Sequence, residues 1–96
     1  MVVVDNEPQG WFLLRDDSGY VLDVNCSQSF VSFAAVLRLT PDEAAEIDAY
    51  GHKATDELAR AIQYSPSKYA DRCGDPTLEA ASHAAIMRWQ IDRPAA

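Results

Sequence analysis

The sequence lacks any long apolar run. No stretch approaches the roughly 18 consecutive apolar residues that a membrane-spanning helix needs. The first eight residues, MVVVDNEP, contain a run of only three valines and no basic segment, whereas an ordinary secretory signal combines a basic start with a longer apolar stretch. We therefore expect a cytoplasmic protein that does not contact a membrane.

Basic side chains are also scarce. Eight Lys and Arg stand against 15 Asp and Glu, which gives a formal net charge of −7. Such a surface repels nucleic-acid phosphates and anionic lipids, so nucleic acid is not expected as a partner. The acidic surface either serves solubility alone or docks onto a basic partner protein, and composition does not choose between these uses.

The motifs of common catalytic and metal sites are missing. The chain has no Gly-rich phosphate loop, no nucleophile elbow and no HExxH zinc motif. Its cysteines, Cys26 and Cys73, and its histidines, His52 and His83, do not have the spacing of a structural zinc site. We expect free thiols, no metal, no cofactor and no catalysis. The alternative is a small enzyme or ligand binder that uses Cys26 with a histidine.

What the sequence does contain is a change in the periodicity of its apolar residues at Thr40-Pro41-Asp42-Glu43. Apolar residues alternate with polar ones before this point and recur every three or four residues after it. Thr40 can cap a helix, Pro41 suits its first position, and Glu43 can bond back to the cap amide. Strands that precede helices in this way predict an α+β fold, and we assign residues 1–96 to a single domain.

The first half predicts a three-stranded antiparallel sheet with one covered face. Asp16-Asp17-Ser18-Gly19 has the composition of a tight turn, and Ser27-Gln28-Ser29 is short enough to link neighbouring strands. The segment Phe30–Val36 is compatible with either a strand or a helix. The predicted strands cover residues 11–15, 20–26 and 30–39.

The second half predicts one long and two shorter helices, bounded by Ser65-Pro66 and Asp75-Pro76. Gly51 falls inside the long helix and predicts either close packing on the sheet or a kink. The ends at residues 1–9 and 93–96 are expected to be flexible. The predicted helices cover residues 41–64, 66–73 and 76–91.

Four polar residues of the long helix, Asp48, His52, Asp56 and Arg60, follow one another at i,i+4 spacing. This spacing predicts a ladder of ion pairs on a solvated face, in which Asp48 and Asp56 raise the pKa of His52. The functional alternative is a pH-sensitive patch or a weak metal site.

The last helix has apolar residues on two sides. One stripe is expected to face the core, and the second must be either sandwiched inside the fold or exposed as an interface. The expected core stripe is Leu78, Ala81, Ala85 and Trp89, and the second stripe is Ala80, Ala84, Met87 and Ile91.

These features predict a small acidic protein-binding module of bacterial type without catalytic activity, with an inhibitor or immunity-type protein as a specific version. A constitutive homodimer that associates through its last helix is a further alternative. Two groups of residues are the candidate sites. The main binding candidates are Met87, Ile91, Asp42, Glu46, Asp56 and Glu57, and the secondary candidate face is formed by Tyr20, Asp23 and Asn25.

Overall fold

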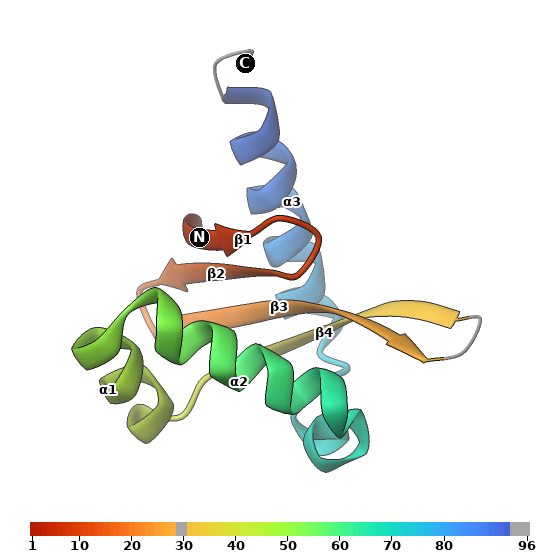
Figure 1. Ribbon diagram of the computed structural model, residues 1–96. Helices are drawn as coiled ribbons and strands as arrows, with labels where there is room; N and C mark the ends of the chain where they lie inside the picture. Colours follow the sequence, from red (N-terminus) through yellow and green to blue (C-terminus); the bar gives the residue numbers. More distant parts are fainter. Residues whose placement is uncertain (29–30, 93–96) are drawn as a thin grey trace.

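The computed structural model describes residues 1–28 and 31–92 and confirms an α+β fold with strands before helices (Figure 1). Four strands come first and are followed by two α-helices, a 3-10 helix and a last α-helix. Their bounds are β1 (Val2–Glu7), β2 (Trp11–Asp16), β3 (Gly19–Gln28), β4 (Val31–Arg38), α1 (Pro41–Tyr50), α2 (His52–Tyr64), η1 (Pro66–Arg72) and α3 (Pro76–Asp92).

The sheet has four strands rather than the predicted three. The order is β1-β2-β3-β4, and each strand pairs antiparallel with the next. Residues 1–9 are expected from the sequence to be a flexible end, whereas residues 2–7 form β1. Three consecutive valines favour a strand, but Asp5 and Asn6 break the alternation by which it could have been recognised. Residues 93–96, the other expected flexible end, lie outside the described residues.

The strand connections agree with the predicted meander, although β3 is longer than expected. Asp16 pairs with Gly19 across the tight turn, and Gly19 has a φ of +127° that favours glycine. β3 continues through Gln28, so the described part of the predicted link at residues 27–29 is strand. The ambiguous segment is strand from Val31 onward, while Phe30 lies outside the described residues.

The predicted helix start at Thr40 is confirmed. The Glu43 backbone N–H donates to Thr40 Oγ1 at 3.2 Å, and the Thr40 N–H donates to Glu43 Oε1 at 2.8 Å. The expected single helix over 41–64 is, however, two helices. Gly51 adopts φ +68° and ψ −139°, which ends α1 and lets α2 start in a new direction (Figure 1).

Helices cover both faces of the sheet, which corrects the expectation of one covered face. α1, α2 and η1 pack on one face and α3 crosses the other (Figure 1). Alternate residues of β3 therefore serve two cores. The larger core, on the side of α1 and α2, includes Trp11, Leu13, Leu22, Val24, Cys26, Leu37, Ile47 and Ile62. The smaller core, under α3, is built from Leu14, Val21, Val36 and Ala85.

The orientation of α3 differs by one position from the predicted core stripe. Leu78, Ala85 and Trp89 do face the sheet, but Ala81 is exposed and Ser82 is fully buried in its place. Burial of Ser82 is possible because its hydroxyl donates to Asp23 Oδ2 at 2.9 Å across the interface with β3.

Candidate functional site

The second apolar stripe of α3 is exposed. We call Ala80, Ala84, Met87 and Ile91 the outer face of α3. Met87 is 45% exposed and Ile91 is 76% exposed, while the two alanines are also open to solvent. The helix crosses the strands and continues past edge strand β1 (Figure 1). Of the two alternatives for this stripe, the structure therefore supports exposure.

The acidic candidate residues lie on the other side of the sheet. Asp42 and Glu46 belong to α1, and Asp56 and Glu57 belong to α2. Asp56 is occupied by structural contacts, because it accepts from the indole N–H of Trp11 at 3.2 Å and pairs with the next residue of the predicted ladder, Arg60, at 3.1 Å. The other three carboxylates are exposed. The structure thus separates the acidic surface from the outer face of α3.

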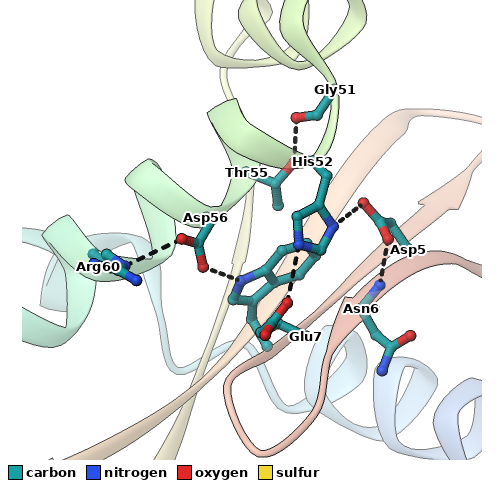
Figure 2. Close-up of polar contacts among 9 residues, drawn as sticks. Asp5, Asn6, Glu7, Gly51, His52, Thr55, Asp56 and Arg60 are labelled. Atoms are coloured by element: carbon teal, nitrogen blue, oxygen red, sulfur yellow. Dashed lines mark hydrogen bonds and ion pairs between the residues drawn. The ribbon is translucent and has the colours of Figure 1, made fainter.

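The predicted ladder around His52 is wrong apart from its last pair. The break at Gly51 removes Asp48 from the helix that begins at His52, and Asp48 instead accepts from the Tyr20 hydroxyl at 2.6 Å. His52 lies between two carboxylates of β1, with Nδ1 2.9 Å from Asp5 and Nε2 3.0 Å from Glu7 (Figure 2).

A register shift in β1 creates this arrangement. The pairing shifts between Val3 and Asp5, so that Asp5 and Glu7 fall opposite Leu13 and Trp11 on the side facing α2. The His52 ring also lies 4.9 Å from the Trp11 ring. Because carboxylates only accept, both ring nitrogens donate when the imidazole is protonated. The hydrogen bond that His52 donates to Asp5, together with the one it donates to Glu7, raises the pKa of His52.

The secondary candidate face does not exist as one surface. Tyr20 shares the side of Leu22 and points toward α1, whereas Asp23 and Asn25 lie on the side of α3. Strand alternation alone separates them, since Tyr20 and Asp23 are three residues apart. Only Asp23 and Asn25 contribute to a common site.

That site is a cavity of about 300 Å³ between the sheet and α3, which we call the α3 pocket. Asp23 accepts from Ser82, and burial raises the pKa of Asp23, although the hydrogen bond from Ser82 and the nearby His83 act in the opposite direction. The pocket is lined by Gln9, Gly10, Trp11, Phe12, Asp23, Asn25, Ala34, His83 and Ile86. The sequence alone does not predict this pocket, because the pocket depends on which side of α3 faces β3. The one available indication was Ser82 itself, a polar residue four positions after Leu78 and three before Ala85.

The cysteine and histidine pairing of the alternative hypothesis is not formed. Cys26 is fully buried in the larger core, where burial and then neighbouring Cys73 raise the pKa of its thiol. His52 is bound to β1, and His83 lies on the opposite side of the sheet. Both thiols are free, as predicted. Within residues 1–28 and 31–92, no three histidine, cysteine or acidic side chains converge in a group that could hold a metal.

Comparison with known proteins provides no relative, since no family model, curated protein or solved structure matches the chain. In the part of the chain that the structure describes, none of the helices is long and apolar enough to cross a membrane.

Proposed function

We propose that this chain is a non-catalytic protein-binding module whose contact surface is the outer face of α3. The observation that carries the proposal is the exposure of Met87 and Ile91 on a helix whose opposite side already packs against the sheet. Exposed apolar side chains that gather on one surface mark protein contacts more often than scattered ones do.

The spacing of the outer face suits insertion of the helix into an apolar groove. Its four residues fall at i, i+4, i+7 and i+11, the pattern of anchors with which an amphipathic helix occupies such a groove. Because α3 continues past β1, the sheet does not obstruct access to the last turns of the helix (Figure 1).

The charge of the chain favours a basic partner over a second copy. Two copies that each carry −7 repel one another, whereas a basic protein is attracted. Asp42, Glu46 and Glu57 are exposed on the far side of the sheet and add to this long-range attraction without contacting the partner. An inhibitor or immunity-type protein that covers a basic partner is the specific version that size and charge support.

The experiment compares lysine substitutions on two surfaces. Met87→Lys and Ile91→Lys alter the outer face of α3, and Tyr64→Lys is the matched control because Tyr64 is 90% exposed on α2. The wild type and the three variants serve as baits in pull-downs with mass spectrometry at low and high salt, followed by calorimetry with the purified partner. We expect a partner that both α3 variants lose, that the control retains, and that binds more weakly in high salt.

Two outcomes would contradict the proposal. One is a partner that binds all four proteins equally, which would place the contact elsewhere. The other is a wild-type dimer, detected by light scattering, that both α3 variants convert to monomer, which would establish the homodimer instead. Thermal unfolding of each variant checks that the fold is intact, since the exposed positions are expected to tolerate lysine.

A further inference from the structure

The α3 pocket contains a carboxylate, that of Asp23, to which few neighbouring groups donate hydrogen bonds. An ionised carboxylate has about four acceptor positions. Among the described residues, Ser82 is the side chain that donates to Asp23, over 2.9 Å to Oδ2. Burial is the main cause of the raised pKa of Asp23, which means that the surroundings disfavour its charge. A ligand that supplies donors and positive charge would remove this disadvantage.

The rest of the pocket offers acceptors and apolar walls. One side-chain N–H of Asn25 donates to the Gln9 carbonyl at 3.2 Å, and the amide oxygen of Asn25 is a further acceptor. Phe12 and Ile86 provide apolar wall, and His83 is exposed at the same cavity. A volume of about 300 Å³ is at the lower end of the range of about 300–1,000 Å³ for small-ligand sites.

We propose that the α3 pocket binds a guanidinium or alkylammonium group on a short aliphatic stem. The charged head bonds to Asp23, and the stem lies against Phe12 and Ile86. A free small molecule and an arginine or lysine side chain of a protein share this chemistry. The proposal does not rest on the protein-binding function above, because the pocket lies under α3 and the outer face points away from the sheet.

Charge is the property that the ligand must have. Hydrogen bonds between a guanidinium and a carboxylate are stronger than those between neutral partners. A neutral urea of the same shape keeps the stem and most of the donors but loses the ion pair. We therefore expect the urea to bind about tenfold more weakly or worse, given the typical net worth of a hydrogen bond to a charged group.

The test is an NMR titration of the full chain with N-acetylargininamide and with its neutral analogue, N-acetylcitrullinamide. We expect the arginine compound to shift the amide signals of Asp23, Ser82 and His83, with the citrulline compound about tenfold weaker or inactive. Asp23→Asn should abolish binding of the arginine compound. Asp17→Asn is the matched control, because Asp17 is an exposed carboxylate in the β2–β3 turn.

Loss of binding in Asp23→Asn must not reflect unfolding. For an acid whose folded pKa is raised, the ionised form destabilises the fold at neutral pH. The asparagine variant is neutral and can still accept from Ser82, so its melting temperature should equal or exceed that of the wild type. Equal binding of the two compounds, or arginine binding that survives in Asp23→Asn, would overturn the proposal.

A second titration distinguishes the two sources of the group. A short peptide with a central arginine that binds more tightly than N-acetylargininamide would support a protein side chain, and equal or weaker binding would support a free small molecule. Met87→Lys should leave both titrations unchanged. The proposal for the α3 pocket and the proposal for the outer face of α3 can therefore be refuted independently of one another.

Discussion

The two faces of the sheet differ in the size and the composition of their hydrophobic cores. On the side of α1 and α2, aliphatic side chains and Trp11 form a continuous core, and polar contacts surround it. On the side of α3, the core is smaller and has the polar Asp23–Ser82 contact beside it, at the α3 pocket. From this comparison we expect the first face to provide most of the stability.

The difference originates in the alternation of β3. Leu22, Val24 and Cys26 point to the face covered by α1 and α2, whereas Val21 is followed on the other face by Asp23 and Asn25. Polar residues in these positions limit the apolar area that α3 can bury. Because burial of apolar area is the main stabilising contribution, we expect α3 to be held less firmly than α2.

Truncation of one isoleucine on each side should reveal the largest difference. Ile62 of α2 is fully buried, while Ile86 of α3 is half-buried. Ile62→Ala should lower the free energy of unfolding by about 2–5 kcal/mol, the range for a buried aliphatic residue cut to alanine. The loss for Ile86→Ala should be smaller than the loss for Ile62→Ala by at least about 1 kcal/mol, because the side chain of Ile86 buries less area. Urea denaturation measures both, and equal losses would contradict the comparison.

An ion pair at the margin of the α3 side should show a smaller, pH-dependent effect. Arg38 donates twice to Asp16, at 2.9 and 2.8 Å, and this lowers the pKa of Asp16 to about 2. A lowered pKa gives stability that is present above the unfolded-state value, about 3.9, and lost as pH falls through about 2. Asp16→Asn should cost about 0.5–1 kcal/mol at neutral pH, because the pair is partly exposed.

Urea unfolding of the wild type and Asp16→Asn at several pH values tests this ion pair. The difference between the two proteins should shrink as the solution is acidified from about pH 4 toward about pH 2. Asp17→Asn, in the neighbouring turn, should show little difference at any pH. A cost for Asp16→Asn that stayed constant into acid would mean that the ion pair is not its source.

The contact between His52 and β1 should give the smallest effect on stability, because the imidazole is about half exposed, at 48%. Its raised pKa means that the contact stabilises the fold below the unfolded-state pKa, and that this contribution fades as pH rises through the folded pKa. An NMR titration should place the wild-type His52 above about 6.5. Asp5→Asn should lower that value, whereas Asp48→Asn should leave it unchanged. An equal decrease in the pKa of His52 in both variants would support the predicted ladder of ion pairs along the helix and contradict the contact with β1.

Local features of the sequence predicted much of this fold. Three features could be predicted because each depends on residues that are close in the sequence. They are the helix cap at Thr40 and Glu43, the turn at Asp16–Gly19 and the apolar period of the last helix. Gly51 was ambiguous because glycine is compatible with both a helix and a break. β1 was missed because its polar half is stabilised by contacts with α2, which is distant in the sequence.

The candidate site was predictable only in part for the same reason. The apolar stripes of α3 allowed either exposure or burial of Met87 and Ile91. Which of the two occurs depends on whether another element packs over the outer side of α3, and the sequence pattern does not show this. The α3 pocket needs Asp23 of β3 to meet Ser82 of α3, a pairing across 59 residues that no local pattern contains. The grouping of Tyr20 with Asp23 ignored strand alternation, and the sequence itself could have corrected it.

Native-state amide hydrogen exchange tests most directly whether the two cores stabilise their helices unequally. Amides in α2 and in the central strands β2 and β3 should exchange only through opening close to global unfolding. Amides in α3 should open with a lower free energy, because that helix covers the smaller core. Protection of α3 equal to that of α2 would contradict the account, since it would show that the smaller core holds its helix as firmly as the larger core does.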